Sequence, residues 1–196
     1  VARPEAYYYL YDNDLPVEGY PTTSMWGLKA AGFDEYGEAL CYNAAGEKIV
    51  QTNATLDDIV YLGQATPKFD LSLTNKFAFG NFDFSFMLVS KLGAKLRMDY
   101  FGGVDVTNRH VVDRWKQAGD ETYYPAATYY GFTTGFLGTN DVFCKSADFL
   151  RLREANLGYN FDSSFVKKIG ISNARVYVQG RNLFLITAKG VDIDPE

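Results

Sequence analysis

The sequence contains few side chains whose types and spacing suit catalysis. His110 is its only histidine, and the surrounding segment TNRHVVD supplies no nearby nucleophile and acid for a Ser/His/Asp arrangement. No pair of acids stands in a recognisable catalytic motif either. We therefore expect that the chain is not an enzyme and has no catalytic residues.

Metal binding is equally poorly supported by the residue pattern. The acidic stretches 12–14, 57–58 and 192–196 lack the spacing of a calcium-binding EF-hand. Cys41 and Cys144 lie far apart and outside any CxxC or Cys/His pattern for zinc. They form either a disulfide or two partly buried free thiols. The expectation is no metal and no cofactor.

Aromatic side chains in one long connection are the stronger binding candidates. Flat apolar rings suit sugar rings and peptide side chains, and concave binding sites rely on such groups. Their alternative use is to pack the loop against its neighbours, which is how most aromatic residues contribute to stability. The candidates for substrate binding are Trp115, Tyr123, Tyr124, Tyr129 and Tyr130.

The elements that position these residues are predicted to be β-strands. Aromatic residues make up 16% of the chain, which favours pleated, half-buried surfaces. No run of about 18 apolar residues is present, so a membrane-spanning helix is not expected. A membrane β-barrel stays open, because its strands alternate apolar and polar residues and the mean hydropathy of -0.19 averages over both. The net charge of -5, without a basic patch, argues against a nucleic-acid partner.

The clearest local unit is a hairpin over residues 68–93. Apolar residues, mostly Phe and Leu, alternate with polar ones on both sides of Gly80-Asn81, a turn pair that tolerates positive φ. Each strand has roughly ten residues, the length with which a tilted barrel strand crosses a bilayer. Strands in soluble proteins are usually nearer five or six residues.

A second predicted strand covers residues 148–161. Leu150 and Leu152 share one face, and Arg151 and Arg153 share the other. After Glu154 the alternation changes phase, which predicts a β-bulge.

A third predicted strand covers residues 174–186. Val176 and Val178 lie on one face, and Arg175, Gln179 and Arg181 lie on the other. The segment before it, DSSFVKKIGIS, is predicted to be a short turn with one helical turn. By contrast, residues 35–62 and 100–145 lack strand periodicity and are predicted to be long loops, which tend to be functional.

Five stretches carry a family resemblance. In order they are VEGYPTTSMWGLKAAGFDEYG at 17–37, YLGQATPKFDLSLTNKFAFGNFDFSFMLVSKLGAKLR at 61–97, RWKQAGDET at 114–122, SADFLRLREANLGYNF at 146–161 and ARVYVQGRNLFLITAKGVDIDPE at 174–196. With these stretches in this order, the chain resembles the C-terminal part of the SusC/RagA family of TonB-dependent outer-membrane transporters.

The resemblance implies an all-β fold: the last antiparallel strands of a large, plugged transmembrane β-barrel of about 22 strands. Residues 1–196 would form the C-terminal portion of that barrel, without the plug or the N-terminal strands. Leu150 and Leu152 would then face lipid. The lumen-facing residues would be Arg151, Arg153, Arg175, Gln179 and Arg181.

The resemblance also implies a function, a location and partners. The function is TonB-dependent import of oligosaccharides or peptides across the bacterial outer membrane. The implied partners are the rest of the barrel and its plug, a SusD-like surface lipoprotein, TonB through the missing N-terminal part, and outer-membrane lipid. An alternative is a soluble β-sandwich that binds carbohydrate, which the aromatic content and acidic charge also fit.

Overall fold

The computed structural model describes residues 17–98, 108–126, 137–191 and 193–195. The chain divides into two compact units, Val1–Thr66 with Ala94–Ser146 (unit 1) and Pro67–Gly93 with Ala147–Glu196 (unit 2). Both units are built on antiparallel strand pairs, which confirms the predicted all-β class. Among the residues described, no helix is long and apolar enough to cross a membrane.

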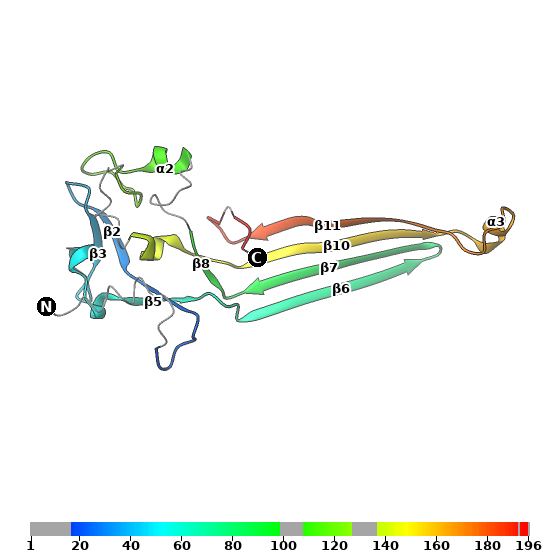
Figure 1. Ribbon diagram of the computed structural model, residues 1–196, viewed down its shortest axis with the longest axis horizontal. Helices are drawn as coiled ribbons and strands as arrows, with labels where there is room; N and C mark the ends of the chain where they lie inside the picture. The colour runs from blue at the N-terminus through cyan, green and yellow to red at the C-terminus, as the bar shows by residue number, and fades with distance from the viewer. Residues whose placement is uncertain (1–16, 99–107, 127–136, 192, 196) are drawn as a thin grey trace. The chain divides into compact units, whose positions relative to one another are not determined.

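Unit 2 is a four-stranded antiparallel sheet with the order β11-β10-β7-β6 (Figure 1). Its strands are β6 (Phe69–Phe79), β7 (Phe82–Leu92), β10 (Phe149–Asn160) and β11 (Arg175–Thr187), with 11, 11, 12 and 13 residues. The predicted hairpin is confirmed, with Phe79 paired to Phe82 around the Gly80-Asn81 turn. The strands therefore have the length that the alternation predicted.

The register separates the two faces of this sheet by polarity. Residues directly opposite each other in a sheet project to the same side. On one face, which we call the apolar face, Leu73 pairs with Leu88 and Leu88 with Leu152. On the other, the polar face, Glu154 pairs with Arg181 and Asn156 with Gln179. Arg151, Arg175, Gln179 and Arg181 all belong to the polar face.

A β-bulge in β10 keeps those faces consistent. The pairing with β7 and β11 shifts between Leu152 and Glu154 and passes over Arg153. The predicted bulge is confirmed, but it lies at Arg153 rather than after Glu154. Because a bulge sets two residues opposite one, Arg153 and Glu154 lie on the same side of the strand. The apolar set then resumes at Ala155, in phase with the rest of the sheet.

A second irregularity, in β11, was not predicted. Between Phe184 and Arg181 the register passes over two residues, Asn182 and Leu183, opposite the single residue Arg153 of β10, and Asn182 has a φ of 50°. Asparagine adopts that left-handed conformation more readily than most residues. On the apolar face, a Cβ at Gly180 would lie 2.6 Å from Leu183 Cδ2, so the glycine makes room for that side chain.

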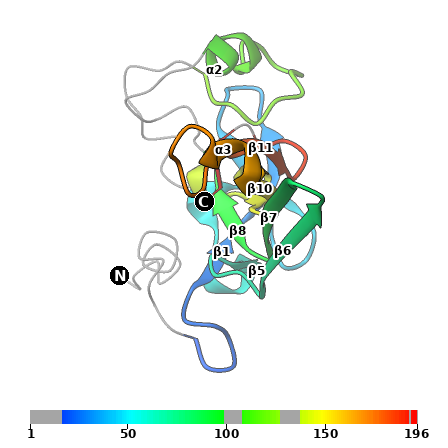
Figure 2. The same cartoon turned by 90° about the vertical axis from the view of Figure 1, so that its right-hand side faces the viewer.

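The connection from β10 to β11 holds the predicted helical turn, α3 (Ser163–Lys167). Figure 2 views the strands from this end, with α3 nearest the reader. The side-chain amide of Asn81 donates to the Asp162 carboxylate at 3.0 Å. The backbone amide of Asn160 donates to the backbone carbonyl of Asn81 at 2.8 Å. The two turns at this end of the sheet are thereby joined.

Unit 1 consists of short strands around small clusters of buried residues. Leu28 and Cys41 are fully buried and pack with Ile49, Ala54 and Ile59, while Ala39 and Phe143 form a second cluster. Its strands are β1 (Ser24–Gly27), β2 (Lys29–Phe33), β3 (Ala39–Tyr42), β4 (Lys48–Val50), β5 (Val60–Gln64), β8 (Lys95–Arg97) and β9 (Cys144–Ser146). Its helical segments are η1 (Gln51–Asn53), η2 (Leu56–Asp58), α2 (Asn108–Asp113), η4 (Leu137–Thr139) and η5 (Asp141–Phe143).

The range 35–62, expected as a loop, is therefore structured. It contains β3, β4, η1, η2 and the start of β5, and β2, β3 and β4 form a three-stranded sheet. These strands have three to five residues, too few to establish a visible alternation. Asp58 ties the segment together, because its carboxylate accepts hydrogen bonds from the amides of Ala44 and Thr55, each at 2.8 Å.

Candidate functional site

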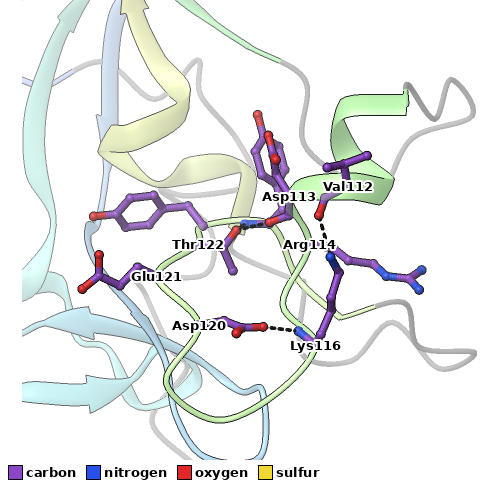
Figure 3. Close-up of a pocket in the computed structure, with 9 residues that line it drawn as sticks. Val112, Asp113, Arg114, Lys116, Asp120, Glu121 and Thr122 are labelled. Carbon is purple, nitrogen blue, oxygen red and sulfur yellow. Dashed lines mark hydrogen bonds between the residues drawn. The ribbon is translucent and has the colours of Figure 1, made fainter.

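Residues 112–124 of unit 1 form a polar cleft. Its volume is about 430 Å³. Figure 3 shows the loop around it, which continues from α2 through Lys116, Asp120 and Thr122. The lining residues are Val112, Asp113, Arg114, Lys116, Asp120, Glu121, Thr122, Tyr123 and Tyr124.

Asp120 holds this loop in shape. Its carboxylate accepts hydrogen bonds from the backbone amides of Lys116 at 2.8 Å and Gln117 at 3.1 Å. The Lys116 ammonium donates to the carbonyl of Val112 at 2.9 Å, and the Thr122 hydroxyl donates to the carbonyl of Asp113 (Figure 3). The cleft is thus built by short-range bonds between its polar or charged side chains and the backbone.

The predicted aromatic candidates divide into different roles. Tyr124 packs against Phe143 with ring centroids 5.7 Å apart, next to the buried Ala39. Trp115 lies over Gly37, where a Cβ would meet its ring at 3.0 Å. Tyr123 lines the cleft as Tyr124 does, but it is 46% exposed. Tyr129 and Tyr130 lie outside the described residues.

The polar face of unit 2 carries a charged network near α3. Arg175 on β11 forms an ion pair with Asp83 on β7, and Asn160 donates to the same carboxylate at 3.1 Å. The pair crosses β10 at Gly158, where a Cβ would lie 2.6 Å from both Arg175 Nη2 and Asp83 Oδ2. Arg175 also lies over the Tyr177 ring, at 5.6 Å from its centroid.

Arg151, on the same face, is held by the segment after β11. It is 7% exposed and forms an ion pair with Asp194. That segment is attached to the sheet by the amide of Ala188, which donates to the Asp148 carbonyl at 3.0 Å. The sequence did not reveal these roles of Asp83, Gly158 and Asp194. The roles of Asp83 and Gly158 depend on the strand register, and that of Asp194 depends on the segment after β11 turning back to Arg151.

Both cysteines are free thiols, which decides between the two alternatives left open by the sequence. Burial, with a smaller effect from the charge of Asp58, raises the pKa of Cys41 to about 11. Burial also raises the pKa of Cys144, although Arg97 and Lys95 act in the opposite direction. Within the described part of the chain, no three His, Cys, Asp or Glu residues are grouped as a metal site.

Among curated proteins, this chain is similar in sequence to TonB-dependent receptors. No family model matches the sequence. TonB-dependent receptor P26 of Formosa agariphila is 29% identical over 166 residues, which cover 82% of this chain and 16% of the receptor. TonB-dependent receptor P39 of the same organism is 28% identical over 140 residues, which cover 67% of this chain and 13% of the receptor.

Solved structures agree on the fold. The RagAB peptide importer in its open-open state superimposes with a TM-score of 0.66 and 21% identity over 90% of this chain and 20% of that one. Its closed-closed state gives a TM-score of 0.63 with 21% identity over 84% of this chain and 19% of that one. The resemblance to SusC/RagA-type TonB-dependent receptors is confirmed.

The fold that this chain shares with these structures is a segment of an antiparallel β-barrel, as predicted. This chain spans only about a sixth of the first curated receptor that it matches, since it covers 16% of that protein.

Proposed function

We propose that this chain forms part of the wall of an outer-membrane TonB-dependent importer, with residues 1–196 as the C-terminal portion of its β-barrel. The proposed cargo is an oligosaccharide or a peptide. The rest of the barrel, a plug domain, a SusD-like lipoprotein and TonB complete the machinery. In this proposal the chain carries out no chemistry on the cargo.

The observation that supports the proposal best is the exposure of the apolar face in unit 2. Bare apolar surface of this extent is rare on soluble proteins and marks contact with a membrane or another protein. The strands that carry it are long enough to cross a bilayer. Its exposed members include Phe69, Leu71, Leu73, Phe77, Phe79, Phe82, Phe84, Leu157, Val176, Val178, Phe184 and Ile186, at 40% to 86% exposure.

The polar face fits the lumen side of the same wall. We propose that Arg151, Arg175, Gln179 and Arg181 face the lumen, with Arg153 directed to the same side by the bulge. An arginine facing lipid at the bilayer midplane costs about 2–4 kcal/mol, so their common face determines which side meets water. The soluble β-sandwich alternative requires the apolar face to be covered, and its exposure argues against that.

For cargo contact, we propose the cleft of residues 112–124, with Tyr123 as the aromatic contact. Tyr123 combines exposure with a place on the cleft wall, whereas Tyr124, which also lines the cleft, packs against Phe143 and Trp115 packs over Gly37. The charged groups around it offer hydrogen bonds to hydroxyl or amide groups of a cargo molecule.

Uptake by intact cells tests the import function. A strain without the full-length receptor should lose growth on one member of a panel of oligosaccharides and oligopeptides, and should regain it when the gene is restored. Inactivating TonB should abolish the same growth. Growth that persists in both mutants for every member of the panel would contradict an import role.

A further inference from the structure

The turn between β10 and β11 presents an unusual combination of exposed side chains. Phe165 is 61% exposed and Ile169 is 66% exposed, with Lys167 and Lys168 between them. Phe165 lies in α3 and Ile169 follows two residues after its end, so the two apolar side chains flank the lysine pair. Their exposure is an energetic cost in water, at about 25 cal/mol for each Å² of apolar surface.

The turn is structurally defined rather than loosely attached. Val166 is 2% exposed, and its carbonyl accepts hydrogen bonds from the amides of Ile169 and Ile171, each at 3.1 Å. Asp162, which begins the turn, is held by the Asn81 amide at 3.0 Å. One apolar residue therefore serves as the internal anchor of the turn, while Phe165 and Ile169 are left outside.

Aromatic contacts connect the apolar face to the start of this turn. Phe82 and Tyr159, which pair in the register of the apolar face, have ring centroids 4.8 Å apart. Tyr159 contacts Phe161 edge-on at 5.0 Å, one residue before Asp162. Rings of this kind are typical of the boundary between hydrocarbon and headgroups at the ends of barrel strands.

We propose that this turn is a phospholipid-binding anchor at the membrane boundary, in which Phe165 and Ile169 enter the headgroup region while Lys167 and Lys168 contact lipid phosphates. The charge and the apolar character of these side chains identify phospholipid as the ligand. Two adjacent cations stand out in a chain with a net charge of -5, and the neighbouring apolar residues match an interfacial segment. Long lysine stems can lie along apolar surface while their ammonium groups reach the phosphates.

This inference rests on the proposed function, because it requires the apolar face to meet lipid. Photo-crosslinking in the full-length receptor, in vesicles containing phosphatidylglycerol, separates the two claims. p-Benzoylphenylalanine is placed singly at Phe165, at Val178 on the apolar face and at Gln179 on the polar face. Adducts are identified by mass spectrometry, and we expect lipid adducts at positions 165 and 178 but not at 179.

The pattern of adducts identifies which claim fails. Lipid at 178 with only protein adducts, or none, at 165 overturns the anchor and leaves the wall intact. The absence of lipid at 178 overturns the proposed function and the anchor with it.

The lysines are tested by Lys167→Gln combined with Lys168→Gln in the receptor labelled at 165. We expect the yield of phosphatidylglycerol adduct to fall by about threefold to tenfold, because each lysine near the surface contributes attraction to anionic lipid. Lys189→Gln, at an exposed lysine after β11, is the matched control and should leave the yield unchanged. An unchanged yield in the double variant would overturn the role of the two lysines.

Discussion

Asp83 and Arg175 form an ion pair across the backbone of Gly158, so that one interaction joins β7 to β11 over the intervening strand β10. The pair is half exposed, with 34% of the Asp83 side chain and 49% of the Arg175 side chain accessible. A contribution near the middle of the range for surface pairs is therefore expected, about 0.5 kcal/mol.

A double-mutant cycle with Asp83→Asn and Arg175→Gln measures this coupling as a difference in the free energy of unfolding. Gly158→Ala should reduce it to near zero, because a Cβ would occupy the path of the pair. Urea unfolding of the full-length receptor in vesicles is the measurement. Asp70 and Lys91, 3.9 Å apart and also on the polar face, are a control pair for which we expect little coupling. An undiminished Asp83–Arg175 coupling in the Gly158→Ala background would refute this geometry.

Asp58 should be required for the order of its segment in unit 1. Removing its charge with Asp58→Asn weakens bonds to the amides of Ala44 and Thr55, at a cost of about 1–3 kcal/mol. Hydrogen exchange in the full-length receptor should accelerate at these two amides by about tenfold or more. Asp57→Asn, at the exposed neighbouring carboxylate, should change neither. Equal effects of the two substitutions would contradict the bonding described for Asp58.

The same carboxylate predicts a pH dependence. Burial acts to raise the pKa of Asp58, but hydrogen bonds from Thr55 and Ala44 outweigh it and lower the pKa below 3.8. Its contribution to stability is therefore fully present above pH 3.8 and is lost as the pH falls through the lowered pKa. Protection of the Ala44 amide should persist at pH 4 and decline at lower pH, and a decline already complete at pH 5 would be inconsistent with a lowered pKa.

The two cysteines should differ in reactivity. Cys41 is fully buried with a pKa of about 11, whereas Cys144 is partly exposed. Maleimide labelling of the folded receptor at pH 7.5, followed by peptide mass spectrometry, should modify Cys144 at least about tenfold faster. Equal labelling rates would place Cys41 on the surface.

The raised pKa of Cys41 also predicts a pH dependence. Because the folded state holds this proton more tightly, the Cys41 contribution to stability is present below pH 9 and is lost as the pH rises towards 11.

Tyr123 and Tyr124 should separate cargo binding from stability. Tyr123→Ala is expected to weaken the affinity for the imported cargo by about threefold to tenfold, the size of one aromatic contact. Tyr124→Ala should instead reduce the free energy of unfolding by about 2 kcal/mol, less than for a fully buried ring, because Tyr124 is only half-buried against Phe143. Binding and thermal unfolding are measured on the same receptor preparations. If Tyr123→Ala leaves affinity unchanged for the cargo that supports growth, the cleft is not its binding site.

The sequence predicted unit 2 well because its strands are long. Alternation over ten or more residues distinguishes β6, β7, β10 and β11 from chance patterns, and even the phase change in β10 could be read as a bulge. The exact position of that bulge, at Arg153, needed the pairing with both neighbouring strands.

Unit 1 was less predictable for the opposite reason. Its short strands are specified by contacts between residues far apart, such as Gln51 with Asn140, whose side-chain amides bond at 2.6 Å. The same limit applies to the candidate sites. Tyr123 and Tyr124 are neighbours of identical type and both line the cleft, and only their packing reveals that Tyr124 also joins a buried cluster whereas Tyr123 stays exposed.

The measurement that tests the central claim most directly compares Val178→Arg with Gln179→Arg in the full-length receptor. The two positions are adjacent in β11, are both exposed, and lie on opposite faces of the sheet. If the apolar face meets lipid, Val178→Arg should destabilise the barrel by about 2–4 kcal/mol and reduce the amount of folded receptor in the outer membrane. Gln179→Arg should have little effect on either quantity. Normal assembly of the Val178→Arg receptor, or equal damage from both substitutions, would contradict the assignment of the two faces.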